Sequence, residues 1–119
     1  MAELALAYKV RSYSTGTLGR AICNARSHHF VADGAGGDEV GAGELFLSGI
    51  AACAVNMVER IAHDDQIPLE WMDVSVESYR DPDKVPGEIS VYDDVRVHFQ
   101  MWGLDDDQGH FLVDTWKRR

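Results

Sequence analysis

The thiol of Cys53 is the group in this sequence with the clearest potential for chemistry, because a deprotonated thiol is a nucleophile. The residues around it are small: Gly49, Ala51, Ala52 and Ala54. Small neighbours allow a ligand or another backbone to approach the sulfur closely. However, a free cysteine is also among the most buried residue types and usually packs as a small hydrophobe. The sequence around Cys53 is therefore compatible with a reactive thiol and with an inert thiol in the core.

Other patterns that could bind a metal, a cofactor or phosphate are weak. The five histidines form no His-x-x-x-His pair, and the two cysteines form no Cys-x-x-Cys pair. His28 and His29 are adjacent, so on a strand they point to opposite faces. Residues 33–43 contain five glycines but no following Gly-Lys-Ser/Thr, and their acidic side chains would repel an anion. We expect no metal and no cofactor, and we interpret the glycine-rich segment as a loop.

The length and charge of the chain indicate its domain number, its possible partners and its location. With 119 residues, we expect one domain, residues 1–119, with a hydrophobic core. A net charge of −9 disfavours nucleic acid and anionic membranes as partners. The N-terminus lacks the features of a signal peptide, and the longest apolar run is shorter than the ~20 residues of a membrane span. We therefore expect a cytoplasmic protein.

The element that must position Cys53 is a helix over residues 44–62. Residues 45–58 are apolar or small except Ser48 and Asn56, and the segment contains no proline. Apolar residues occur at every angle around this helix, which predicts burial on most sides. One small sheet cannot cover apolar side chains on all sides of a helix, so we expect a homodimer in which a second copy covers the rest.

Strands are predicted on both sides of this helix. Alternation predicts a first strand over residues 4–11, and turn signals separate it from strands at 18–25 and 28–32, which predicts an antiparallel meander. Further alternation predicts strands at 71–79 and 89–101. Asp105 followed by Gln108 is typical of a capping box at the start of a last helix through Trp116. The fold class expected is α+β, with an antiparallel sheet packed on a long buried central helix.

Three segments of the chain carry a resemblance to a known family. They are GRAICNARSHHFVAD, GGDEVGAGELFLSGIAACAVNMVERIA and VRVHFQMWGLDDDQ. In these segments and in the order of its elements, the chain resembles the OsmC/Ohr family of osmotically inducible and organic-hydroperoxide-resistance proteins. The resemblance implies an intertwined homodimer with two active sites at its interface. In active members a peroxidatic cysteine on the central helix attacks a hydroperoxide, and Cys53 matches that position.

The chain departs from the family pattern at the other catalytic positions. Glu44 lies nine residues before Cys53, whereas hydroperoxide-resistance members have their glutamate ten residues before it, where this chain has Gly43. An acidic residue also stabilises a helix start, and we expect this role for Glu44 first. Arg20 is the nearest match to the activating arginine, with Arg26 as the second choice. The second, resolving cysteine is absent, and the C-terminal end is short relative to the family.

Two functions remain open from the sequence. The first is a one-cysteine peroxidase that reduces small organic hydroperoxides through Cys53, with an external thiol as the reductant. The alternative is a non-enzymatic dimeric domain that binds a small apolar ligand at the dimer interface.

Overall fold

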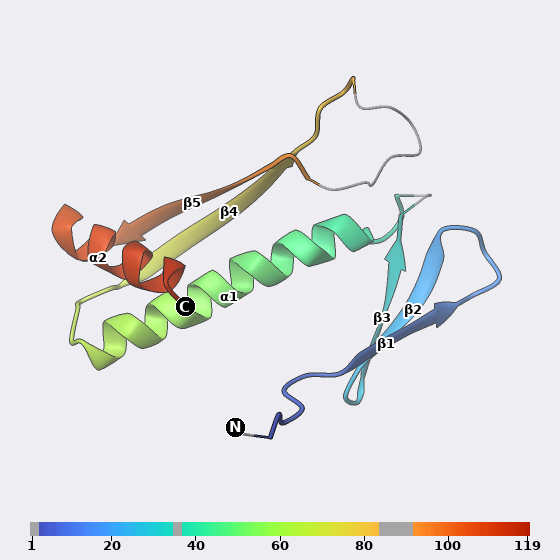
Figure 1. Cartoon of the computed structure of the whole chain (residues 1–119), viewed down its shortest axis with the longest axis horizontal. Coiled ribbons are helices and arrows are strands. Elements are labelled where there is room, and N and C mark those ends of the chain that lie inside the picture. The colour runs from blue at the N-terminus through green and yellow to red at the C-terminus, as the bar shows by residue number, and fades with distance from the viewer. Residues whose placement is uncertain (1–2, 35–36, 84–91) are drawn as a thin grey trace. The chain divides into compact units, whose positions relative to one another are not determined.

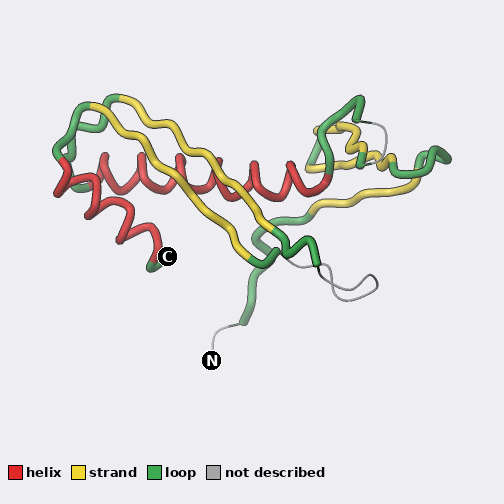
Figure 2. The backbone as a smooth tube through the Cα atoms, turned by 90° about the horizontal axis from the view of Figure 1, so that it is seen from above, coloured by secondary structure: helices red, strands yellow, loops and turns green. Residues whose placement is uncertain are grey.

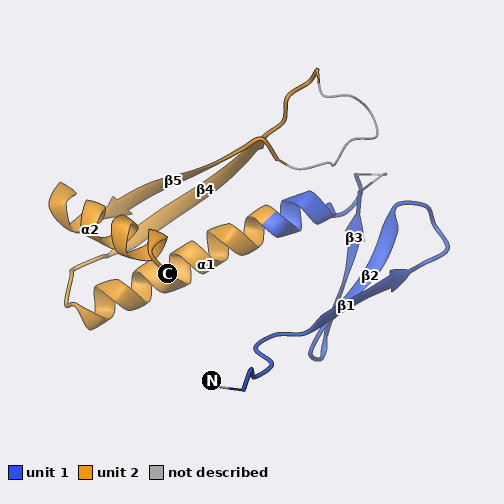
Figure 3. Ribbon diagram, in the orientation of Figure 1, with its two compact units in different colours: residues 1–46 blue, residues 47–119 orange. Residues whose placement is uncertain are grey.

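The computed structural model describes residues 3–34, 37–83 and 92–119, which form five strands and two helices (Figure 1). They follow the order β1 (Val10–Ser14), β2 (Arg20–Ala25), β3 (His28–Asp33), α1 (Ala42–Asp64), β4 (Trp71–Tyr79), β5 (Asp94–Trp102) and α2 (Asp106–Lys117). The chain divides into two compact units, Met1–Phe46 and Leu47–Arg119, and the division falls within α1 (Figure 3).

The first unit contains an antiparallel sheet in the order β1-β2-β3, so the predicted meander is confirmed. The register places Ser12 opposite Cys23 and Arg20 opposite Asp33. Two residues connect β2 to β3, and the first of them, Arg26, adopts a left-handed conformation with φ 58°. This tight turn ends β2 at Ala25.

The predicted start of the first strand at Leu4 is wrong, because β1 begins only at Val10. Val10 is paired with Ala25, the last residue of β2, so β2 offers no partner to the residues before Val10. Leu4, Leu6 and Tyr8 consequently have 97%, 80% and 93% of their surface exposed. Alternation identified side chains suited to a sheet, but a strand also requires a neighbouring backbone.

The second unit contains an antiparallel pair of strands, β4 and β5, which lie side by side along their length (Figure 2). The prediction of β4 is confirmed at both ends. β5 begins at Asp94, later than the predicted residue 89, and residues 89–91 lie outside the described residues. The predicted capping box is confirmed: Gln108 N–H donates to Asp105 Oδ1 at 2.8 Å, and Asp105 N–H donates to Gln108 Oε1 at 3.1 Å.

The core of the second unit forms where α1, the two strands and α2 meet. Val58 and Leu112 are fully buried at its centre, together with Ile61 and Ala62. Seven half-buried residues pack against them: Ile67, Leu69, Met72, Phe99, Met101, Leu104 and Trp116. Phe99 and Trp116 meet edge to face, with ring centroids 5.3 Å apart. α2 is therefore docked onto the core by its apolar face.

The α+β class is confirmed, but the strands form two sheets in the single chain. α1 is also less enclosed in the single chain than predicted, since its buried residues are Ala54, Val58, Ile61 and Ala62. With 23 residues, α1 is long and apolar enough to cross a membrane by length and composition alone, so the expectation that its apolar run is too short for a span is wrong. The core helix of a soluble protein can have the same length and composition, and in the second unit α1 contributes the buried residues Val58, Ile61 and Ala62 to the core.

Candidate functional site

Cys53 lies in the middle of α1, and its side chain is exposed in the single chain. Its sulfur lies 3.6 Å from the thioether sulfur of Met57, one helical turn later, to which the thiol donates a weak hydrogen bond. Residues four apart lie on the same helix face, so this contact follows from the spacing. The inert-thiol interpretation required burial in the core, and the exposure of Cys53 therefore favours an accessible thiol.

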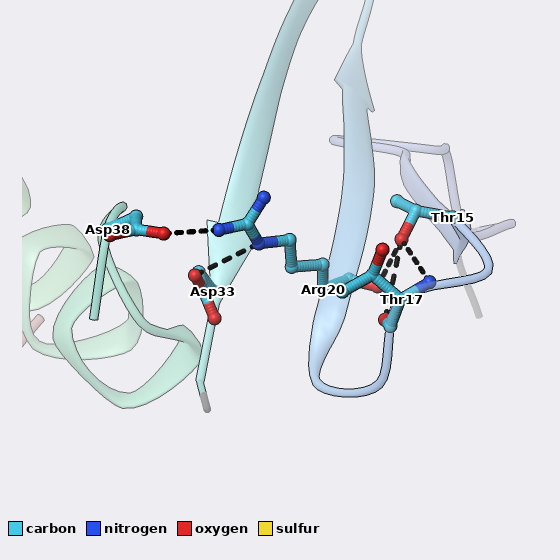
Figure 4. A network of polar contacts seen from close by, with 5 residues as sticks. All are labelled: Thr15, Thr17, Arg20, Asp33 and Asp38. Carbon is cyan, nitrogen blue, oxygen red and sulfur yellow. Dashed lines mark hydrogen bonds and ion pairs between the residues drawn. The ribbon is translucent and has the colours of Figure 1, made fainter. Parts of the chain in front are cut away.

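Arg20 forms ion pairs with two aspartates in the first unit (Figure 4). Its Nε donates to Oδ2 of the buried Asp33 at 3.1 Å, and its Nη2 donates to Oδ2 of Asp38 at 2.5 Å. The hydrogen bond and charge of Asp33, followed by the charge of Asp38, raise the pKa of Arg20 above its ordinary value. Because Asp33 ends β3 and Asp38 lies in the glycine-rich loop, Arg20 fastens this loop to the sheet.

The turn that leads into Arg20 is fixed by a second set of hydrogen bonds (Figure 4). The hydroxyl of Thr15 accepts from the backbone N–H of Thr17 at 3.1 Å and donates to the Thr17 carbonyl at 3.4 Å. The backbone N–H of Arg20 also donates to the Thr17 carbonyl, at 3.1 Å. These contacts hold Arg20 at the start of β2, opposite its partner Asp33.

Glu44 is the third residue of α1, and its Oε1 accepts a hydrogen bond from the backbone N–H of Gly41 at 2.9 Å. This contact is half of a capping box, and it satisfies a backbone donor beside the first turn. The role of Glu44 at the helix start is therefore confirmed. The glycine-rich segment is a loop into α1, as expected, and Asp33 N–H donates to the Val40 carbonyl across it at 2.9 Å.

The predicted site residues belong to different units. Arg20, Arg26 and Glu44 lie in the first unit, whereas Cys53 lies in the second. Arg26 occupies the exposed turn between β2 and β3. The catalytic roles of Arg20 and Glu44 stay predictions, to which the structure adds a local structural role for each.

Cys23, the other cysteine, is half-buried on β2 and is a free thiol, as is Cys53. Its sulfur accepts a hydrogen bond from the Ser12 hydroxyl at 3.2 Å, which follows from the pairing of these residues across β1 and β2. Among the described residues, no group of three or more His, Cys, Asp or Glu side chains could hold a metal ion.

A polar cluster on the exposed face of the β4–β5 pair was not predicted from the sequence. Glu77 accepts a hydrogen bond from the Tyr79 hydroxyl and lies 2.9 Å from His98 Nε2. The Tyr79 bond, followed by the charge of His98, lowers the pKa of Glu77 and outweighs the opposing effect of desolvation. The guanidinium of Arg96 lies over the Tyr79 ring at 4.4 Å and pairs with Asp94. The register of the two strands would have revealed this cluster, since Glu77 is paired with Arg96.

Residues 35–118 match the family model described as OsmC-like protein. The chain belongs to the OsmC-like protein family. The matched segment includes Cys53, β4, β5 and α2, whereas Arg20 precedes it. The resemblance proposed from the sequence is therefore confirmed at the level of the family.

Solved structures of other proteins share the fold of this chain. An OsmC-like protein from Mycoplasma pneumoniae has a TM-score of 0.85 at 14% identity, covering 98% of this chain and 84% of that one. A Legionella pneumophila protein has a TM-score of 0.71 at 18% identity, covering 98% of this chain and 85% of that one. It is described as an organic hydroperoxide resistance protein OsmC, "predicted redox protein, regulator of sulfide bond formation". No curated protein matches the chain.

Proposed function

We propose that this OsmC-like protein is a thiol-dependent peroxidase that reduces organic hydroperoxides through Cys53. The observation that carries the proposal is the exposed, free thiol of Cys53 in the middle of the family's central helix. The description of the Legionella protein as a hydroperoxide resistance protein supports the same substrate class. The expected site of action is the cytoplasm, where thiol reductants are available.

The reaction needs one cysteine and two molecules of an external thiol. The Cys53 thiolate attacks the terminal peroxide oxygen, the O–O bond breaks, an alcohol leaves, and Cys53 becomes a sulfenic acid. One thiol then condenses with the sulfenic acid to give a mixed disulfide and water. The second thiol attacks this disulfide and returns Cys53 to its reduced form. In this scheme an external thiol condenses directly with the sulfenic acid, because α2 contains no cysteine that could do so.

Arg20 and Glu44 are proposed to assist Cys53, as the family resemblance implies. A cation near a thiol stabilises its thiolate, but the two aspartates bound to Arg20 offset part of its charge. Arg20 would therefore act as a fixed, hydrogen-bonding group more than as an isolated charge. The Arg20→Gln variant should slow alkylation of Cys53 at neutral pH, whereas Arg80→Gln, which replaces an exposed arginine that is not a site candidate, should leave the rate unchanged. Equal rates in the two variants would remove Arg20 from the site.

We propose that the active form is a homodimer. Leu4 and Leu6 are 97% and 80% exposed in the single chain, and Phe46 in α1 is 60% exposed. An exposed apolar surface of this kind marks an interaction site, and a second copy of the chain would cover it. Light scattering at micromolar concentration should give twice the chain mass of 13.2 kDa. A monomer would contradict the proposal.

The absence of a cysteine from α2 favours a second candidate function. In this alternative the OsmC-like fold is a non-enzymatic dimeric domain, and a small apolar ligand occupies its interface. The two functions differ in what peroxide does to the protein.

Turnover of cumene hydroperoxide with dithiothreitol tests the peroxidase proposal. The unsubstituted protein should consume hydroperoxide, Cys53→Ser should abolish consumption, and Cys23→Ser should retain it. Cys23→Ser is a matched control because it removes the same sulfur atom from a half-buried strand position. Equal consumption by the Cys53→Ser variant and the unsubstituted protein would refute a role for this thiol.

A further inference from the structure

A groove in the first unit combines basic side chains with an apolar lining. It has a volume of about 740 Å³ and is lined by residues 7–11 and 24–26, which we call the basic groove. Small-molecule sites commonly enclose about 300–1,000 Å³. The groove exists because the chain leaves the sheet before Val10, while β2 turns sharply at Arg26. Its shape therefore follows from the late start of β1.

The charge of this groove is opposite to that of the whole protein. Lys9, Arg11 and Arg26 line it, and residues 4–32 contain no aspartate or glutamate, although the net charge of the chain is −9. Among the described residues, the ion pairs found do not include these three cations, whereas Arg20 is paired with two aspartates. The positive charge of the groove is thus available to an anion.

The remaining lining of the groove suits an apolar or aromatic body. Ala7, Val10 and Ala25 contribute apolar surface, and Tyr8 presents a ring that is 93% exposed. Tyrosine rings bind other rings by offset stacking or by edge contacts. A ligand that placed an oxyanion against the cations and a ring against this surface would use both parts of the groove.

We propose that the basic groove binds a small organic anion, in which a phosphate or carboxylate is attached to a ring-sized apolar body. Every residue that lines the groove belongs to the first unit, and the proposed site residues Cys53, Arg20 and Glu44 are not among them. Arg11 and Arg26 can donate paired hydrogen bonds to an oxyanion, and Lys9 adds a point charge. An acidic segment of a second copy is the competing occupant, and the concave, partly apolar lining favours the small molecule.

Titration of the 15N-labelled protein with phenyl phosphate at low salt tests this proposal by NMR. Amide shifts should concentrate at residues 7–11 and 24–26, and binding should weaken as salt screens the cations. Inorganic phosphate lacks the ring and benzyl alcohol lacks the charge, so each should bind less tightly than phenyl phosphate. Equal binding of either compound, or shifts located elsewhere, would overturn the proposal.

Substitutions in the groove have a matched control in the second unit. Arg11 lies over the Tyr13 ring at 4.6 Å, and Arg80 lies over the Tyr92 ring at 5.4 Å. Arg11→Gln should weaken phenyl phosphate binding by about two- to fivefold, as expected for a partly exposed ion pair, whereas Arg80→Gln should leave it unchanged. Arg11→Lys should recover part of the loss because it keeps the charge.

The triple variant K9Q/R11Q/R26Q should lose phenyl phosphate binding and keep the far-ultraviolet circular dichroism spectrum of the parent. Unchanged binding by the folded triple variant would overturn the proposal. A parent protein that does not bind phenyl phosphate, with a dimer that dissociates in the triple variant, would assign the groove to a second copy and also overturn it.

Discussion

Replacement of Leu112 by alanine should be among the most damaging single changes to the stability of this protein. Leu112 is fully buried, and it lies in the cluster where α2 meets Val58 of α1. Removing three buried carbon atoms from such a position costs about 3–5 kcal/mol, because the lost transfer free energy adds to that of the cavity. For a chain of this length, each kcal/mol lowers Tm by roughly 3–5 °C, so Tm should fall by about 10–20 °C.

Differential scanning calorimetry and urea titration at one protein concentration measure this loss, since the stability of a dimer depends on concentration. Leu18→Ala is the matched control because Leu18 is 94% exposed, and it should change the free energy of unfolding by less than ~0.5 kcal/mol. A loss below ~1 kcal/mol for Leu112→Ala would refute the packing of α2 onto α1.

Three further predictions follow from individual contacts. The lowered pKa of Glu77 means that its contribution to stability is complete above its unfolded-state pKa and is lost as pH falls through the lower folded-state pKa. Glu77→Gln should therefore flatten the acid side of the stability–pH curve, and an unchanged curve would exclude the Tyr79 contact. Gly103→Ala should cost at least ~2 kcal/mol, since φ is 97° and a Cβ would lie 2.5 Å from the Pro68 carbonyl oxygen. Gly16 has a similar φ of 93°, but a Cβ added there would have no atom within 4 Å. Gly16→Ala should therefore lose less stability than Gly103→Ala, and the difference measures the cost of the steric clash at Gly103. Iodoacetamide should alkylate the exposed Cys53 faster than the half-buried Cys23, by peptide mass analysis, and equal rates would contradict the accessible thiol.

Local patterns in the sequence predicted much of the second unit. Alternation identified β4 without error, and the spacing of Asp105 and Gln108 located the start of α2. The central helix was predicted within two residues at each end. These features depend on neighbours within a few residues, so the sequence contains the information directly. The start of the first strand was predicted at Leu4 and lies at Val10, because strand formation also depends on which backbone lies beside the chain.

The candidate site was predicted less completely than the fold. The family resemblance identified Cys53 as the candidate nucleophile. The preference of acidic residues for a helix start predicted that Glu44 stabilises the start of α1, and its contact with the backbone N–H of Gly41 shows this role. The attachment of Arg20 to Asp33 and Asp38 could not be predicted, because it requires the strand register and the path of the glycine-rich loop. Exposure of the Cys53 thiol likewise depends on tertiary packing, which composition alone does not determine.

Intact mass spectrometry after treatment with cumene hydroperoxide, without added thiol, tests the central claim most directly. The reduced protein should gain one oxygen atom, as the sulfenic acid of Cys53, and a second with excess peroxide, as the sulfinic acid. The Cys53→Ser variant should gain neither, whereas Cys23→Ser should behave as the parent does. An unchanged mass of the parent protein would contradict peroxidase function, and a loss of two hydrogen atoms would contradict the one-cysteine route by identifying Cys23 as the resolving thiol.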